Sequence, residues 1–195
     1  MIAGLLLAAG EGARLGTPKA LVEFGGERLV DRGVRLLAEG GCRPVVVVLG
    51  AATVQVRGAV SVRNPDWRTG MGSSLRAGLA ALPPEATAVV VALVDQPLVR
   101  AGAVRALAAS GAGLAVATYG GRRANPVLIA REHFAGVAEL AVGDVGARAF
   151  MKAHPGLVTE VACDEHGDPA DIDTPQDLEL LEGRWKRVLD LLEGR

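Results

Sequence analysis

Residues 2–19 read IAGLLLAAGEGARLGTPK, an apolar run followed directly by a glycine-rich segment. The apolar run, residues 2–8, has the length and composition of a buried β-strand. The segment after it contains two basic side chains, Arg14 and Lys19, among its glycines. Glycine lets the backbone turn sharply and approach a ligand, so that main-chain N–H groups can point at an anion. The basic side chains add charge where phosphate oxygens would lie. The sequence therefore predicts a phosphate-binding loop after the first strand.

The spacing of this loop differs from two common phosphate-binding motifs. A P-loop places Lys-Ser or Lys-Thr directly after its last glycine, whereas Gly16 is followed by Thr17 and Pro18. The dinucleotide fingerprint G-x-G-x-x-G requires glycine where the chain has Leu15, which disfavours a dinucleotide-dependent oxidoreductase. An ordinary turn between a strand and a helix also contains glycine, and this alternative stays open.

Composition narrows the class of protein. With 195 residues, half of them hydrophobic, the chain has the length of one domain, 1–195, but no apolar run reaches the roughly 18 residues of a membrane helix. The net charge of −1 argues against nucleic acid or a membrane surface as a partner. Cys42 and Cys163 lack the spacing of a zinc site or a disulfide framework. Because the N-terminal residues also lack a basic leader, we expect a soluble cytoplasmic protein.

Apolar β-rich runs alternate with helical patterns along the chain. Strands are expected at residues 2–8, 44–49, 60–63, 88–94, 113–118 and 158–163, and helices at 28–39, 73–82, 101–109, 144–153 and from 175 toward the C-terminus. Valine-rich runs such as VVVVL at 45–49 indicate strands that are covered on both faces. Alternating strands and helices imply right-handed βαβ units. The prediction is a single-domain α/β fold with a Rossmann-like, doubly wound, mostly parallel sheet.

Polar residues and glycines gather directly after the expected strands. These segments are residues 9–19, 64–74, 95–97, 119–125 and 171–173. In a doubly wound sheet, ligands bind beyond the carboxyl ends of the strands. We therefore expect the segments to surround one binding cleft.

Acidic residues in two of these segments are candidate metal ligands. Asp95 ends an apolar run, and a carboxylate there is costly to bury unless it is paired or binds a cation. Asp171 and Asp173 flank Ile172, so in an extended segment they would face the same side. Mg²⁺ binds through one or two carboxylates together with substrate phosphates, which favours a magnesium site beside the phosphate loop. A cap or turn role for Asp95 is the alternative.

Two further segments are candidates for substrate binding. Gly72, Ser73 and Ser74 open an expected helix, where unpaired N–H groups would suit a base edge, a ribose or an anion. Simple serine capping would explain the same residues. Farther along the chain, Asn125, Asp144 and Arg148 are candidates on the side of a second substrate. The last two could instead pair with each other, since they are one helical turn apart.

Six segments in this order resemble the molybdenum-cofactor nucleotidyltransferases. They are LAAGEGARLGTPK (7–19), NPDWRTGMGSSLRAGL (64–79), DQP (95–97), NPVLI (125–129), GDVGAR (143–148) and DIDTP (171–175). The chain is most similar to the cytidylyltransferases of that group. Ala9 stands where guanylyl-transferring relatives carry a second glycine, and Gln96 stands within DQP where they carry DMP. The resemblance covers nearly the whole chain and implies the fold of the nucleotide-diphospho-sugar transferases.

The resemblance also implies a reaction: transfer of CMP from CTP to the phosphate of molybdopterin (the molybdenum cofactor), with release of pyrophosphate and Mg²⁺ as cofactor. A molybdoenzyme or its chaperone would receive the product. The implied residues are Arg14, Lys19 and Asp95 for catalysis; Leu7, Ala8, Ala9, Gly10, Arg14, Lys19, Gly72, Ser73, Ser74 and Asp95 for the nucleotide; Asp95 and Asp173 for the metal; and Asn125, Asp144, Arg148 and Asp171 for the acceptor. Two alternatives remain: a transferase of the same fold with GTP or another phosphorylated acceptor, and a non-catalytic nucleotide- or cofactor-binding chaperone.

Overall fold

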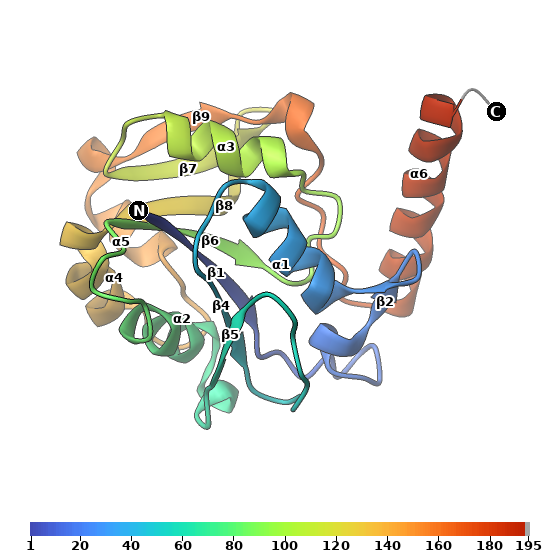
Figure 1. Ribbon diagram of the computed structural model, residues 1–195, viewed down its shortest axis with the longest axis horizontal. Coiled ribbons are helices and arrows are strands. Elements are labelled where there is room, and N and C mark those ends of the chain that lie inside the picture. The colour runs from blue at the N-terminus through green and yellow to red at the C-terminus, as the bar shows by residue number, and fades with distance from the viewer. Residues whose placement is uncertain (194–195) are drawn as a thin grey trace.

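A seven-stranded sheet forms the centre of the computed structural model, which describes residues 1–193 (Figure 1). Its strands are β1 (Ile2–Ala8), β4 (Val45–Leu49), β5 (Val60–Arg63), β6 (Ala88–Leu93), β7 (Leu114–Tyr119), β8 (Arg122–Ala130) and β9 (Thr159–Ala162), in the spatial order β5-β4-β1-β6-β8-β7-β9. Every strand of this sheet runs in the same direction except β8, which is antiparallel to both of its neighbours. The predicted α/β fold with a mostly parallel sheet is confirmed.

Helices cover both faces of the sheet. They are α1 (Leu29–Glu39), α2 (Met71–Ala80), α3 (Ala101–Ala109), α4 (Phe134–Leu140), α5 (Arg148–Ala153) and α6 (Pro175–Glu193), with short 3-10 turns at Lys19–Leu21, Trp67–Thr69, Arg131–His133, Pro155–Leu157 and Asp164–His166. Alternate residues of β1 divide the core: Leu6 packs with α1 and α3, whereas Leu5 and Leu7 pack with α2, α4 and α5. This two-layer covering explains why both faces of the central strands are apolar. No helix within residues 1–193 is both long and apolar enough to cross a membrane.

Two expectations about local structure were wrong. Residues 119–125 were expected only as a polar segment after a strand, and no strand was expected at 122–130, but Gly120 and Gly121 form a tight turn that sends the chain back as β8. Both glycines have positive φ (+56° and +72°), as a two-residue hairpin turn of type I′ requires. The helix expected at 144–153 begins only at Arg148, because residues 144–147 form an irregular turn.

A small hairpin of β2 (Glu23–Phe24) and β3 (Glu27–Arg28) holds α6, which stands apart from the sheet in Figure 1. The Phe24 and Trp185 rings are 5.6 Å apart, and the Arg32 guanidinium lies 5.1 Å and 5.3 Å from their centres. Gly25 has φ +58°, and a Cβ on it would overlap the Trp185 ring. This anchor sets the position of the chain just before α6, where Asp173 lies.

Candidate active site

The predicted site residues meet at one edge of the sheet. The parallel strands β1 and β6 end at this edge, and the antiparallel β8 begins there. The residues form two neighbouring groups. We call Arg14, Lys19, Asp95 and Asp173 the charged cluster, because ion pairs join all four. The candidate acceptor residues Asn125, Asp144, Arg148 and Asp171 line a cavity beside it.

Lys19 is the centre of the charged cluster. Its Nζ atom lies 2.5 Å from Asp95 Oδ2 and 2.5 Å from Asp173 Oδ1, and the Arg14 guanidinium lies 3.4 Å from the other oxygen of Asp173. Only 17% of the Lys19 side chain is exposed. Burial by itself would lower the pKa of Lys19, but the attraction of both carboxylates outweighs it and raises the pKa above its ordinary value. The lysine is therefore a fixed positive charge at neutral pH.

Backbone hydrogen bonds bring the two carboxylates together. The Ile172 N–H donates to the Asp95 carbonyl (2.8 Å), and the Ile172 side chain is fully buried. The Asp177 carboxylate accepts hydrogen bonds from the N–H groups of Asp173 (3.1 Å) and Thr174 (2.8 Å) and so caps the start of α6. The segment before α6 is thus held against the end of β6.

The loop after β1 presents unused donors beside the charged cluster. Within the described residues, the N–H groups of residues 10–14 donate no hydrogen bond. The loop closes on itself, because the N–H groups of Leu15 and Gly16 both donate to the Gly12 carbonyl (2.8 Å and 3.0 Å). Gly12 has φ +62°, and a Cβ on it would overlap the Thr17 carbonyl oxygen. A row of free N–H groups next to basic side chains is suited to a polyphosphate.

The start of α2 differs from the expectation of unpaired N–H groups. The Gly72 N–H donates to the Gly143 carbonyl (2.8 Å), and the Ser73 N–H donates to the carbonyl three residues earlier (3.2 Å). Both serine hydroxyls are buried and accept hydrogen bonds from the Asn64 amide, at 2.8 Å for Ser73 and 3.0 Å for Ser74. The expectation was wrong for these two N–H groups, because the Gly143 carbonyl and the turn itself already accept their hydrogen bonds.

The first residues of the predicted nucleotide site lie at the end of β1. Leu7 lines the cavity, Ala8 is buried in the core on the opposite face of the sheet, and Ala9 is 7% exposed. Ala9 packs where β4 ends: a Cβ on Gly50 would lie 2.8 Å from the Ala9 Cβ and 2.6 Å from the Trp67 Cβ. The Ala9 methyl group therefore occupies space at this edge that a glycine would leave open.

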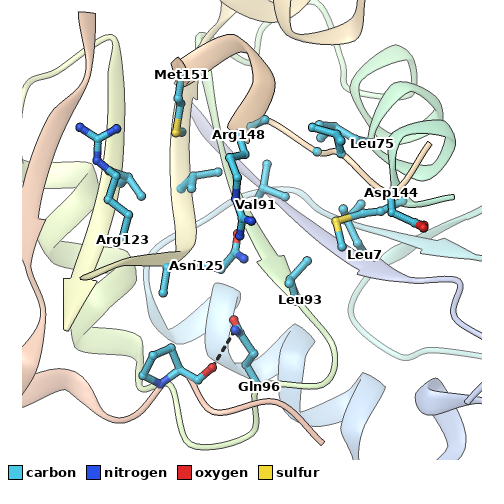
Figure 2. A pocket seen from close by; sticks show the side chains of 18 of the residues that line it. Leu7, Leu75, Val91, Leu93, Gln96, Arg123, Asn125, Asp144, Arg148 and Met151 are labelled. Atoms are coloured by element: carbon cyan, nitrogen blue, oxygen red, sulfur yellow. Dashed lines mark hydrogen bonds between the residues drawn. The ribbon is translucent and has the colours of Figure 1, made fainter. Parts of the chain in front are cut away.

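A cavity of about 780 Å³ lies at the same edge of the sheet as the charged cluster, and Gln96 and Asp171 are among the residues that line it. Figure 2 shows side chains of this cavity. Its floor consists of apolar side chains from the sheet: Leu7, Val91, Leu93, Val116 and Val127. Its polar lining includes Gln96, Arg123, Asn125, Asp144, Arg148, Lys152 and Asp171. Figure 2 shows Arg148 reaching from α5 toward Asn125 on β8. No ion pair joins Asp144 and Arg148 in the part of the chain that the structure describes. An apolar floor with polar groups around it is typical of sites for small molecules.

Asp171 lies between the charged cluster and the cavity. Burial, together with repulsion from Asp95, raises the pKa of Asp171, while a hydrogen bond from the Gln96 amide (2.8 Å) opposes this shift. The same amide donates to the Pro169 carbonyl (2.8 Å). Sequence reasoning did not assign Gln96 a contact, although a polar residue directly after a buried strand could have indicated one.

The carboxylates of the charged cluster fit a divalent metal ion whose remaining ligands come from a phosphate. No group of three or more His, Cys, Asp or Glu side chains within residues 1–193 is placed to hold a metal ion. Asp95 and Asp173 nevertheless converge on one point, the position of the Lys19 Nζ atom. Mg²⁺ often takes one or two carboxylates and completes its coordination with water and substrate phosphates. Both the number and the type of these ligands agree with such a site.

Comparisons with known proteins identify the family. The family described as "MobA-like NTP transferase domain" matches residues 4–158. The protein named nicotine blue oxidoreductase from Paenarthrobacter nicotinovorans is 37% identical over 193 residues, which cover 91% of this chain and 94% of that protein. A probable molybdenum cofactor guanylyltransferase from Opitutus terrae is 37% identical over 102 residues, 51% of this chain and 50% of that protein.

Two solved structures are similar to nearly the whole chain. The homologue of Mycobacterium tuberculosis Rv0371c from Mycobacterium sp. strain JC1 has 32% identity and a TM-score of 0.82, covering 96% of this chain and 98% of that one. Rv0371c itself, in a complex with manganese, has 28% identity and a TM-score of 0.76, covering 93% of this chain and 98% of that one. The chain therefore belongs to the MobA-like NTP transferase domain family and is an enzyme of the nucleotidyltransferase type.

Proposed function

We propose that the protein transfers CMP from CTP to the phosphate of molybdopterin and releases pyrophosphate, with Mg²⁺ as cofactor. One observation carries this proposal: the free N–H groups of residues 10–14 lie beside Lys19 and the convergent carboxylates Asp95 and Asp173, next to a cavity for a second substrate. The arrangement offers a place for a triphosphate, a metal and an acceptor at one edge of the sheet.

The chemistry needs charge stabilisation and alignment more than a protein nucleophile. An oxygen of the acceptor phosphate attacks the α-phosphorus of CTP. The bond from that phosphorus to the oxygen bridging to the β-phosphorus breaks, and pyrophosphate leaves with the electron pair. Arg14, Lys19 and the free N–H groups would bind the triphosphate and the leaving group. Asp95 and Asp173 would hold Mg²⁺, which when bound neutralises charge on the phosphate oxygens.

The cavity is the proposed acceptor site. Its apolar floor suits the face of a flat ring, while Asn125, Asp144 and Asp171 offer hydrogen-bonding groups for the polar edge of a pterin. Arg148 would bind the acceptor phosphate. The name of the Opitutus terrae relative supports molybdenum cofactor as the acceptor class. A molybdoenzyme or its chaperone would then accept the product.

The choice of CTP over GTP is supported by Ala9. Its methyl group packs near Gly50 and Trp67 and narrows the space at the ends of β1 and β4. A purine needs more room there than a pyrimidine does. The Opitutus terrae relative is named a guanylyltransferase, and the nucleotide comparison below distinguishes the two bases.

Pyrophosphate release tests the proposal. The purified protein is incubated with Mg²⁺, molybdopterin with or without molybdenum, and each of CTP, GTP, ATP and UTP. We expect release only with CTP and only when the acceptor is present. Release with GTP alone would refute the cytidine assignment, and no release with any nucleotide would refute the proposed reaction. We expect Arg148→Met to raise the KM for the acceptor and to leave CTP affinity unchanged, whereas the exposed Lys186→Met should change neither.

A second candidate function follows from the Paenarthrobacter relative, which is named an oxidoreductase and matches almost the full length of the chain. A nicotinamide dinucleotide would then occupy the loop after β1. Leu15, at a position where the dinucleotide fingerprint has glycine, argues against this candidate. Oxidation of NADH or NADPH by an aromatic acceptor without metal, together with no pyrophosphate release, would favour it.

A further inference from the structure

The ammonium group of Lys19 lies where a metal ion bridging Asp95 and Asp173 would have to lie. Its Nζ atom is 2.5 Å from one oxygen of each carboxylate. These three side chains come from the loop after β1, the end of β6 and the segment before α6, so one point joins three distant parts of the chain. The side chains of Lys19 and Asp95 are each 17% exposed, whereas 40% of the Asp173 side chain is exposed.

A metal ion and the ammonium group exclude each other at this point. Oxygen ligands lie about 2.0–2.1 Å from Mg²⁺, so an ion held by both carboxylates needs the volume that the Nζ atom fills. Electrostatic repulsion also disfavours binding of a metal ion while the ammonium group is in place. Lys19 and Arg14 already balance the two carboxylates, and a divalent ion would add unfavourable positive charge while Lys19 stayed in place.

A bound triphosphate would give Lys19 another partner. The lysine stem passes over Gly10, where a Cβ would lie 3.7 Å from the Lys19 Cδ atom, and the free N–H groups begin at Gly10. A lysine has a flexible four-carbon stem and a compact charge, so its ammonium can exchange carboxylate oxygens for phosphate oxygens. The phosphates would also supply the ligands that two carboxylates leave missing.

We propose that Lys19 keeps divalent metal out of the Asp95–Asp173 site until a polyphosphate binds, and that the ammonium then moves from the carboxylates to the phosphates. Metal and nucleotide would bind as a coupled pair, and each would raise the affinity of the other by the same factor. This inference rests on the proposed function only in its use of metal and triphosphate. It is independent of the base and of the acceptor.

The experiment measures Mn²⁺ binding without turnover. Equilibrium dialysis at matched concentrations of free Mn²⁺ gives protein-bound Mn²⁺ for the wild type, Lys19→Met and Lys186→Met, each with and without inorganic tripolyphosphate, which itself chelates Mn²⁺. The Lys186 variant also loses one of the three lysines, but this residue is exposed on α6. We expect wild type and Lys186→Met to bind Mn²⁺ roughly tenfold or more tightly with tripolyphosphate than without it. Lys19→Met should bind Mn²⁺ alone roughly tenfold more tightly than wild type and show lower affinity for tripolyphosphate in the absence of metal.

Two results would overturn the proposal: unchanged or weaker binding of Mn²⁺ alone by a folded Lys19→Met variant, or equal Mn²⁺ affinity of the wild type with and without tripolyphosphate. Equal affinity in the wild type would overturn the proposal even if the variant did not fold, which circular dichroism would reveal. Because neither CTP nor molybdopterin is used, coupled binding of Mn²⁺ and tripolyphosphate together with no pyrophosphate release would refute the proposed reaction and leave this inference intact.

Discussion

Replacement of Gly12 by alanine tests whether the loop after β1 binds the nucleotide through its backbone. Gly12 has φ +62°, and a Cβ there would overlap the Thr17 carbonyl oxygen, so the loop must change shape. Alanine in the left-handed region also costs about 1–2 kcal/mol. A shift of the loop would turn at least one of the N–H groups of residues 10–14 away from the phosphates. Hydrogen bonds to charged groups contribute about 1.5–3 kcal/mol, which corresponds to a CTP affinity roughly ten- to a hundredfold lower.

Gly16→Ala is the matched control for this change. Gly16 lies in the same loop with φ +73°, but nothing lies within 4 Å of the position of its Cβ. It therefore carries the same backbone strain without the steric overlap. Calorimetry measures CTP affinity and thermal unfolding measures stability for both variants. If Gly12→Ala bound CTP as tightly as Gly16→Ala does, the loop would not act through the geometry described above.

The hairpin that holds α6 carries two more predictions. Gly25→Ala should loosen the packing of α6, lower Tm and change Trp185 fluorescence, because the new Cβ would overlap the indole. Gly26→Ala is the control: Gly26 has φ +82°, nothing lies within 4 Å of the position of its Cβ, and the variant should keep the fluorescence of the wild type. The hydrogen bond from Arg35 lowers the pKa of Glu27, so this glutamate contributes stability that is present above its unfolded pKa and is lost as pH falls through its lower folded pKa. The free energy of unfolding of Glu27→Gln should therefore fall less steeply with decreasing pH than that of the wild type. Urea denaturation at a series of acid pH values measures this. Equal pH dependence in both proteins would contradict this role.

Sequence reasoning selected side chains that the fold brings close together. Lys19 and Asp173 are 154 positions apart in the chain, yet they form an ion pair. Asp95 stood out because a carboxylate directly after a buried strand is expensive to leave unpaired. Lys19 was selected as one of two basic residues in the glycine loop, and Asp173 because it flanks Ile172 together with Asp171. Their roles in binding CTP and metal stay predictions. Sequence reasoning assigned Lys19 to phosphate and the aspartates to metal, and it did not foresee the contact between them.

The antiparallel strand β8 shows where local pattern was insufficient. The glycine pair before it is a hairpin signal, and the run NPVLIA at 125–130 is apolar enough for a strand. The sequence analysis nevertheless expected no strand at this position, and neither feature says between which strands the segment pairs. The choice of partners depends on hydrogen bonds with β6 and β7. Both strands are antiparallel to β8, and β6 is separated from β8 in the sequence by α3 and β7. Because β8 begins at the ligand edge, this pairing is what brings Asn125 into the cavity.

The amino-acid sequence by itself determined the class of fold, the mostly parallel sheet and the glycine loop with its two basic residues. These features depend on periodicity and on local backbone freedom, which act over a few neighbouring residues. Only the tertiary structure decided that the N–H groups of Gly72 and Ser73 are used internally and that Lys19 occupies the point between Asp95 and Asp173. Hydrogen bonds and ion pairs of this kind depend on distances between segments that are far apart in the chain, and those distances exist only once the sheet and α6 have packed.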